Sequence, residues 1–382
     1  MISFDYQPRT RIIFGGGRLV ELGQLAGELG ARRALVVSDP GIMAAGHTAR
    51  GIESLEKAGI ETHLFSDVGE NPTTEHVEAG VAVARRYQPE LLVGLGGGSS
   101  MDCAKGINFV YSCGGRMQDY WGVGKAPREM LPMIAVPTTA GTGSETQSFA
   151  LISDAATHAK MACGDKKATC RVALLDPQLT VTQPRRVTAL TGIDAIAHAL
   201  ETYVTKPRNP VSTAFSREAW RLLSENFASV LDDPENLAAR GGMQLGACFA
   251  GLAIENSMLG ATHALANPLT ARYKIAHGQA IALMLPHVVR YNAVEVGRLY
   301  RELLESTPVN GQPRPAAIAE DLADSIAAMV EKAGLAGRLS DCGVERERLA
   351  ELAAAATREW TGGFNPRIVT EADLLDLYRA AY

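Results

Sequence analysis

The chain has 382 residues, of which 46% are hydrophobic and 21% are charged. This composition is typical of folded soluble proteins and excludes disordered and fibrous classes. Lys and Arg total 37 against 42 for Asp and Glu, so the chain has no basic excess that would favour nucleic acid as a partner. A chain of this length is expected to form two domains.

The cysteines and the N-terminal residues indicate the compartment. Six cysteines are scattered without C-x-x-C pairing, which favours free thiols in a reducing environment. The start "MISFDYQPRT" has no secretory signal pattern, and no uninterrupted apolar run reaches membrane-spanning length. We therefore expect a cytoplasmic protein with no membrane partner.

The first half, residues 1–183, alternates short apolar runs with helical stretches. The runs in "RRALVVSDPG", "ELLVGLGGGSS" and "MLPMIAVPTTAGTGSE" each end in a loop marked by Gly or Pro. This rhythm predicts an α/β domain with a parallel sheet covered on both faces. Ligands are expected at the carboxyl ends of its strands.

The second half, residues 184–382, carries its apolar residues at helical spacing, which predicts an all-helical domain. One face of a predicted helix consists of Phe215, Ala219, Leu222, Leu223, Phe227 and Val230. Further helices are predicted in "AAIAEDLADSIAAMVEKAGL", "RERLAELAAAATREW" and "TEADLLDLY", the last capped by Thr370 with Asp373 three residues on. "TKPRNP" and "TPVNGQPRP" are predicted loops.

A glycine loop follows one apolar run in "LLVGLGGGSSMDCAKG". Three glycines, Gly96 to Gly98, precede Ser99 and Ser100, and a helix is predicted to begin at Met101 and Asp102. Such a loop can bring backbone N–H groups close to a pyrophosphate at the amino end of a helix. The alternative is a glycine turn that serves only chain geometry. The predicted strand before the loop and the predicted helix after it favour phosphate binding.

A second polar loop and one acid strengthen the dinucleotide interpretation. "VPTTAGTGSE" supplies Thr138, Thr139, Thr142 and Ser144 after the next predicted strand. Asp39 ends "ALVVSDP", where an acid can accept hydrogen bonds from ribose hydroxyls and repel an additional phosphate, which favours NAD over NADP. Asp39 before Pro40 is equally consistent with simple turn chemistry.

The stretch "TGIDAIAHALETYV" places Asp194 and His198 one helical turn apart in apolar surroundings. The two side chains could simply bond each other. His263 and His277 lie in similar surroundings, however, and four such groups could converge on one cation, because buried ionisable groups are costly unless paired or metal-bound. One Asp and three His suit a divalent ion such as Fe²⁺ or Zn²⁺. An alcohol bound there would have its O–H pKa lowered and could release hydride to a nicotinamide.

With these motifs the chain resembles the iron-containing (group III) alcohol dehydrogenase family over essentially its whole length. The similarity rests on "GGGSSMDCAK", "PTTAGTGSE", "GIDAIAHALETYV", "LGATHAL" and "AHGQAIALMLPHVVRYN". It implies a Rossmann-like N-terminal domain and a helical C-terminal domain, as in the dehydroquinate synthase-like superfamily. It also implies a cleft holding NAD(P) and a metal, usually Fe²⁺, and a homodimer or larger assembly.

The resemblance also implies the site residues. The family's metal ligands fall on Asp194, His198, His263 and His277. Its nucleotide contacts fall on Asp39, Asn71, Gly97, Gly98, Ser99, Asp102, Thr138, Thr139, Thr142, Lys160 and Leu179.

One position departs from the family. Many members have a second histidine near the nicotinamide, in a suspected proton relay, where this chain has Asn267. An amide cannot carry a proton near neutral pH. We expect proton release through water or cofactor ribose hydroxyls, or a changed substrate preference.

The leading hypothesis is a metal-dependent, NAD-linked dehydrogenase that interconverts a small primary alcohol and its aldehyde. Alternatives within the superfamily are a zinc-dependent glycerol dehydrogenase, a metal-free maleylacetate reductase and a dehydroquinate synthase. The complete Asp and His set argues against the metal-free branch, and the lack of an extra basic cluster argues against the synthase. A non-catalytic NAD-binding regulator is the alternative from another class.

Overall fold

The computed structural model describes residues 3–306 and 319–382. They form two compact units, Gln7–Gln183 and Pro184–Tyr382, and the second unit also contains residues 3–6. The predicted loop "TPVNGQPRP" and the first residues of "AAIAEDLADSIAAMVEKAGL" lie outside the described residues.

The first unit is built on a six-stranded sheet in which every strand pair is parallel, as the sequence predicts. In spatial order its strands are β1 (Arg11–Phe14), β9 (Val172–Leu175), β6 (Met133–Pro137), β4 (Leu91–Gly96), β2 (Arg33–Val37) and β3 (Glu61–Phe65). The helices of this unit are α1 (Leu22–Glu28), α2 (Pro40–Ala44), α3 (His47–Lys57), α4 (Thr74–Tyr87) and α5 (Gly98–Cys113).

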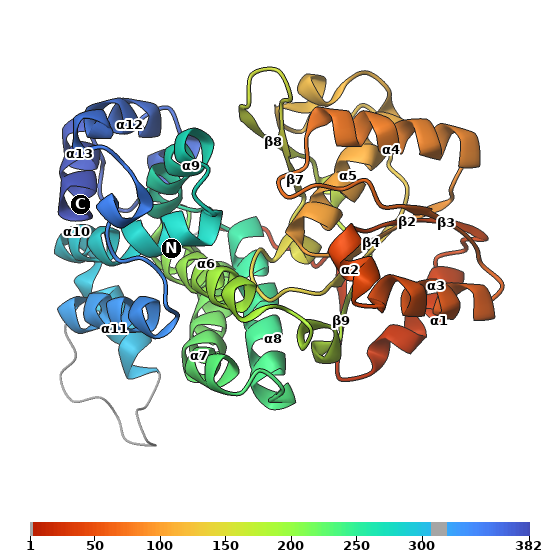
Figure 1. Cartoon of the computed structure of the whole chain (residues 1–382), viewed down its shortest axis with the longest axis horizontal. Coiled ribbons are helices and arrows are strands. Elements are labelled where there is room, and N and C mark those ends of the chain that lie inside the picture. The colour runs from red at the N-terminus through yellow and green to blue at the C-terminus, as the bar shows by residue number, and fades with distance from the viewer. Residues whose placement is uncertain (1–2, 307–318) are drawn as a thin grey trace. The chain divides into compact units, whose positions relative to one another are not determined.

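Helices cover both faces of this sheet, because alternate side chains of a strand point to opposite sides. In β2, Leu35 and Val37 belong to the apolar core that also contains residues of α4 and α5. Ala34 and Val36 belong to the opposite core, which is formed with α1 and α3 (Figure 1). A sheet buried on both faces explains why its strands read as continuous apolar runs.

A second, three-stranded sheet was not expected from the sequence. It consists of β5 (Gly122–Val123), β8 (Lys160–Gly164) and β7 (Phe149–Ser153), with β7 antiparallel to β8. The expectation of a purely parallel arrangement is therefore incomplete. The strands β5, β7 and β8 have only two, five and five residues, so each gives a weak sequence signal and the pairing between them defines the sheet.

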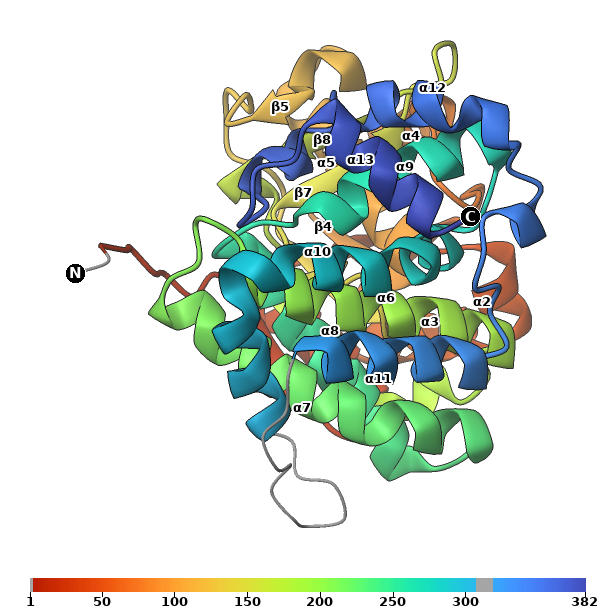
Figure 2. The same cartoon turned by 90° about the vertical axis from the view of Figure 1, so that its left-hand side faces the viewer.

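The second unit is helical, as predicted. Its helices are α6 (Arg185–Val204), α7 (Pro210–Asp232), α8 (Leu237–Glu255), α9 (Ala261–Tyr273), α10 (His277–Glu305), α11 (Ala319–Lys332), α12 (Leu349–Ala356) and α13 (Glu371–Ala380). Helix α6 packs against α7, α8 and α10 (Figure 2). As predicted, Thr370 caps α13, because its hydroxyl accepts a hydrogen bond from the Asp373 N–H. The segment "TKPRNP" connects α6 to α7, also as predicted.

The predicted apolar face of helix α7 is only partly buried. Ala219, Leu223, Phe227 and Val230 are buried, whereas Phe215 and Leu222 are half-buried. The Phe215 ring contacts Tyr6 and Phe249 instead of the centre of the core.

Helix α8 is long and apolar enough to cross a membrane, a feature that the sequence analysis did not expect. However, 67% of its apolar window is buried inside the protein. Packing against α6 and α7 accounts for this composition, since a helix that is apolar on all sides belongs in a protein core as well as in a membrane.

Candidate metal and nucleotide sites

Helix α6 holds the acid and the imidazole that the sequence places one turn apart. Asp194 and His198 are both buried, with 6% and 5% of their surface exposed. Burial is costly for a carboxylate or an imidazolium unless a partner compensates. The partners of these side chains therefore decide what the pair can do.

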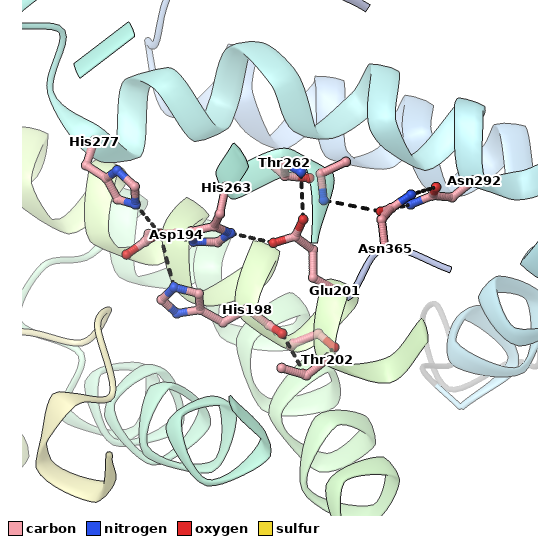
Figure 3. Close-up of polar contacts among 11 residues, drawn as sticks. Asp194, His198, Glu201, Thr202, Thr262, His263, His277, Asn292 and Asn365 are labelled. Carbon is pink, nitrogen blue, oxygen red and sulfur yellow. Dashed lines mark hydrogen bonds and ion pairs between the residues drawn. The ribbon is translucent and has the colours of Figure 1, made fainter. Parts of the chain in front are cut away.

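Three imidazoles converge on one carboxylate oxygen (Figure 3). His263 comes from the first turn of α9, and His277 is the first residue of α10. The Nε2 atoms of His198, His263 and His277 lie 3.3, 3.5 and 3.6 Å from Oδ1 of Asp194. We call these four residues the Asp–His cluster. All four predicted ligands thus lie together, on three separate helices.

The Asp–His cluster has the donor set of a divalent-metal site. Ligand atoms of Asp194, His263 and His277 all lie within 4.8 Å of one another. Among the described residues, Oδ1 of Asp194 and Nε2 of His263 are buried and have no hydrogen-bond partner. A cation between these atoms would satisfy them, and three nitrogens with one oxygen suit Fe²⁺ or Zn²⁺.

The charges within the cluster shift its pKa values. Burial alone would raise the pKa of Asp194, but the three imidazoles outweigh burial and hold it below its ordinary value. Burial alone would lower the pKa of His263, but the carboxylates of Glu201 and Asp194 raise it to about 9. Without an ion this imidazole therefore favours its doubly protonated form at neutral pH. Metal binding at Nε2 must displace the proton on that nitrogen.

Glu201 contacts the Asp–His cluster, and the sequence analysis did not single it out. It is buried on α6, and its Oε2 accepts a hydrogen bond from Nδ1 of His263. Its other oxygen accepts the backbone N–H of Thr262 at 2.7 Å. Its spacing was an available signal, because Asp194, His198 and Glu201 fall at i, i+4 and i+7 on one face of a helix. Such carboxylate–histidine pairs fix the tautomer and orientation of metal ligands.

Asn267 lies one turn after His263 on α9, at the position where the family often has histidine. Its Nδ2 donates to Oε2 of Glu359 at 2.8 Å. Asn267 is half-buried and, one helical turn from His263, lies on the same side of α9 as that cluster residue.

The predicted nucleotide residues follow the carboxyl ends of neighbouring strands. Asp39 follows β2, Gly97 follows β4 and Thr138 follows β6, and these strands are adjacent in the sheet. Oδ1 of Asp39 caps α2 by accepting the Ile42 N–H, and its Oδ2 accepts from Oγ of Ser100 at 2.9 Å. The turn interpretation of Asp39 is therefore correct, and the same side chain reaches the glycine loop.

The glycine loop and the threonine loop pack directly on each other. Helix α5 begins at Gly98, three residues before the predicted start at Met101, so Gly98 is part of its first turn, Gly97 is its N-cap and Gly96 ends β4. A Cβ on Gly98 would lie 2.6 Å from Cγ2 of Thr142. The hydroxyl of Thr138 is buried with no hydrogen-bond partner among the described residues. Bare backbone and an uncommitted hydroxyl fit the polar groups of a dinucleotide.

A buried lysine, also missed in the sequence analysis, organises the threonine loop. Nζ of Lys105 donates to the carbonyl and hydroxyl of Ser144 and to the carbonyls of Gln147 and Phe149. Asp102, a predicted nucleotide contact, accepts from Oγ of Ser144 at 2.6 Å, and burial raises its pKa. Asp102, on α5, therefore holds the threonine loop through Ser144.

The remaining predicted nucleotide residues occupy different environments. The N–H of Asn71 points to Oγ of Ser99 at 3.4 Å, and its backbone is left-handed with φ of 55°, a conformation that Asn tolerates. Lys160 begins β8 and is exposed. The side chain of Leu179 is fully buried in the core, so only its backbone is available to a ligand.

The fold and these two sites define a class of protein. A parallel sheet with a phosphate-type glycine loop, together with a helical unit bearing an Asp–His cluster, is the combination expected of a metal-dependent dehydrogenase. The sequence matches the family described as iron-containing alcohol dehydrogenase over residues 8–177. It matches the C-terminal part of the Fe-containing alcohol dehydrogenase family over residues 188–382. The chain therefore belongs to the iron-containing alcohol dehydrogenase family.

Individual relatives agree with this assignment. The chain is 33% identical to the NAD-dependent methanol dehydrogenase of Bacillus methanolicus, with 100% of each chain covered. It superposes on a crystal structure of 1,3-propanediol oxidoreductase with a TM-score of 0.94, at 32% identity and with 100% of each chain covered. It also superposes on sulfoacetaldehyde reductase from Bifidobacterium kashiwanohense in complex with NAD+, with a TM-score of 0.89, 27% identity, and 100% and 99% of the two chains covered.

These comparisons confirm several expectations from the sequence. The family, the two-part fold and an oxidoreductase activity on alcohols and aldehydes are confirmed. The predicted cofactors, NAD and iron, agree with a family described as iron-containing and with relatives that use or bind NAD.

Proposed function

We propose that this chain interconverts a small primary alcohol and its aldehyde, with NAD bound at the glycine loop and a divalent ion, Fe²⁺ or alternatively Zn²⁺, bound by the Asp–His cluster. The observation that carries the proposal is the convergence of three imidazole Nε2 atoms on Oδ1 of Asp194. The names of the relatives from Bacillus methanolicus and of the propanediol oxidoreductase support a short alcohol as substrate.

The roles of the residues follow from their contacts. Asp194, His198, His263 and His277 would hold the ion, which lowers the pKa of a bound alcohol hydroxyl when present. Glu201 keeps Nδ1 of His263 engaged and so directs Nε2 toward the cluster. Bound NAD would supply the hydride acceptor for the substrate carbon, and the hydroxyl proton would leave through water or a cofactor ribose hydroxyl.

The NAD part of the proposal rests on the loops of the first unit. The backbone N–H groups at the start of α5 would face the pyrophosphate, where the helix dipole favours negative charge. The hydroxyls of Thr138, Thr139 and Thr142 line the neighbouring loop. The carboxylate of Asp39 would accept from the ribose and disfavour a phosphate on it.

Replacing Asp39 with asparagine is expected to raise the use of NADP. Asparagine keeps an oxygen for the Ile42 N–H and so preserves the cap of α2, while the repelling charge is removed. We expect the ratio of kcat/KM for NADP to that for NAD to rise roughly tenfold, which corresponds to about 1.4 kcal/mol. Steady-state kinetics with both cofactors measures it, and an unchanged Tm controls for the cap. An unchanged ratio would assign Asp39 a turn role alone.

Replacing Asn267 with histidine is expected to change how the rate depends on pH. An imidazole with an ordinary pKa near 6.5 would add a group that can take the substrate proton near neutrality. We expect kcat for alcohol oxidation to gain a new titration step. Glu359→Gln is the control, because it alters the hydrogen-bond partner of Asn267 without adding an imidazole. A profile identical to that of the original enzyme would argue against any proton-relay role at this position.

The substrate assay separates the remaining candidate functions. Protein supplied anaerobically with NAD, Fe²⁺ and a panel of short alcohols should form NADH, with the highest kcat/KM for one small primary alcohol. Preference for glycerol with Zn²⁺ would indicate a glycerol dehydrogenase. Turnover without metal would indicate a maleylacetate reductase-like enzyme. No turnover with any alcohol or aldehyde would favour a non-catalytic NAD-binding regulator.

We also propose a cytoplasmic location and a homodimer or larger homo-oligomer. All six cysteines are free, and five of them are buried, which suits a reducing compartment. The family that the sequence resembles commonly forms dimers or larger assemblies. Sedimentation velocity of the purified chain tests it, and a monomer at micromolar concentration would overturn it.

A further inference from the structure

The amino end of α9 is capped by residues from distant parts of the chain. The helix begins after Gly260, which has no side chain that could accept the first N–H groups. The N–H of Ala261 donates to Oδ1 of Asn365 at 3.2 Å, and the N–H of Thr262 donates to Oε1 of Glu201 at 2.7 Å. The next residue is the cluster histidine His263. The start of the helix that carries this ligand is thus fixed from outside the helix.

One carboxylate holds both the backbone and the ring of this short segment. Glu201 accepts from the Thr262 N–H with one oxygen and from Nδ1 of His263 with the other. An imidazole whose Nδ1 carries the donated proton presents Nε2 as an acceptor for a metal. The positive end of the α9 dipole lies at the Glu201 carboxylate, which accepts a backbone N–H of its first turn.

A reciprocal amide pair holds the other cap. Nδ2 of Asn292 donates to Oδ1 of Asn365 at 3.0 Å, and Nδ2 of Asn365 donates to Oδ1 of Asn292 at 2.7 Å (Figure 3). Both side chains are 1% exposed. Two buried amides with mutual bonds have a fixed orientation, because turning either one would place like groups face to face. Asn292 lies on α10, the helix that begins with the ligand His277.

Gly260 makes this double cap possible. A Cβ at position 260 would lie 3.0 Å from Oδ1 of Asn365 and 3.1 Å from Oε1 of Glu201. These distances are tighter than ordinary carbon–oxygen contacts, so any larger residue would push both acceptors away from the helix end. Gly260 therefore leaves room for the two acceptor oxygens at the start of α9.

We propose that Glu201, Asn365 and Asn292 are positioning residues for the metal. Together with Gly260 they form an anchor, called here the α9 anchor, which fixes the start of α9 and the ring of His263 and thereby sets the affinity of the Asp–His cluster for its ion. This inference rests on the proposed metal site and deepens it, because Asn365, Asn292 and Gly260 are not ligands themselves.

The test measures metal affinity directly. The full-length protein is freed of metal, and Co²⁺, a spectroscopic probe for such sites, is titrated in competition with a chelator. Glu201→Gln keeps the size of the side chain but leaves one oxygen for two donors. We expect its Co²⁺ affinity to fall roughly 10- to 100-fold, the usual effect of removing a partner of a metal-bound histidine. The Co²⁺ absorption bands should shift as well, since His263 no longer has a fixed ring orientation.

Two further variants keep the proposal testable if Glu201→Gln folds poorly. Asn365→Ala and Gly260→Ala should each weaken Co²⁺ binding several-fold, although neither residue donates an atom to the ion. Tyr378→Phe is the matched control, since it removes a buried 2.6 Å hydrogen bond from Tyr378 to the Leu265 carbonyl on the same helix without contacting the α9 anchor. It should lower the Tm of the metal-free protein while leaving the Co²⁺ affinity within threefold of the original.

Failure of the proposed metal site and failure of the α9 anchor give different results. If the original protein does not bind Co²⁺, or if His263→Ala binds it equally well, the proposed metal site itself is wrong. If the original protein binds Co²⁺ and His263→Ala does not, while all three anchor variants bind it as tightly as Tyr378→Phe, the metal site stands and the α9 anchor is overturned.

Discussion

Replacing His263 with alanine is expected to release the metal and to lower kcat for alcohol oxidation by at least about a thousandfold. Polarisation of the substrate oxygen by a metal contributes several kcal/mol to transition-state stabilisation, and each 1.36 kcal/mol is about a factor of ten in rate. His263 is also the ligand that contacts Glu201, so its loss leaves a buried carboxylate without its imidazole partner. Metal analysis and steady-state kinetics of the purified variant measure both effects.

His287→Ala is the control for this substitution. His287 lies in the same helical unit on α10, outside the Asp–His cluster, and burial lowers its pKa. We expect this variant to retain its metal and at least half of the activity. Retention of metal and turnover by His263→Ala would contradict the assignment of the cluster.

Replacing Gly278 with alanine is expected to destabilise the protein and to weaken metal binding together. Gly278 follows the ligand His277, and a Cβ there would lie 2.2 Å from the backbone carbonyl oxygen of Leu190 on α6. That oxygen cannot rotate away, so the start of α10 must move, and His277 with it. Overpacking of this kind costs about 2 kcal/mol. Urea unfolding and metal content test the expectation.

Gly337→Ala serves as the matched control in the same unit. A Cβ at Gly337 meets no atom within 4 Å, so its Tm and metal content should stay unchanged. If Gly278→Ala were as stable and as fully metallated as Gly337→Ala, the close approach of α10 to α6 could not be what places His277.

Local sequence signals indicated the Asp–His cluster only in part, and the family resemblance supplied the full set of predicted ligands. Asp194 and His198 stand one turn apart in an apolar helix, and a buried charge there demands a partner. That His263 and His277 complete the group depends on how α9 and α10 pack on α6, which spacing cannot give. Glu201 shares the face of Asp194 and His198, but an acid at i+7 is ambiguous until the orientation of α9 is known.

The glycine and threonine loops were predicted at the carboxyl ends of the right strands, but with an imprecise local structure. Gly98 starts α5 although glycine is a poor helix former, and Thr142 leaves no room for a side chain at this position. Lys105 was hidden within a family motif, since its role depends on four carbonyl and hydroxyl oxygens of a loop about 40 residues further on. The small sheet around β7 and β8 was missed because short strands with mixed side chains carry little periodicity.

The most direct test of the central claim is metal removal followed by restoration. Protein purified anaerobically should contain one equivalent of a divalent ion per chain. Complete removal by a chelator should abolish NAD-linked alcohol oxidation, and one equivalent of Fe²⁺ should restore it, whereas Asp194→Asn should neither retain nor regain the ion. Undiminished turnover by protein stripped of every divalent ion would contradict the account.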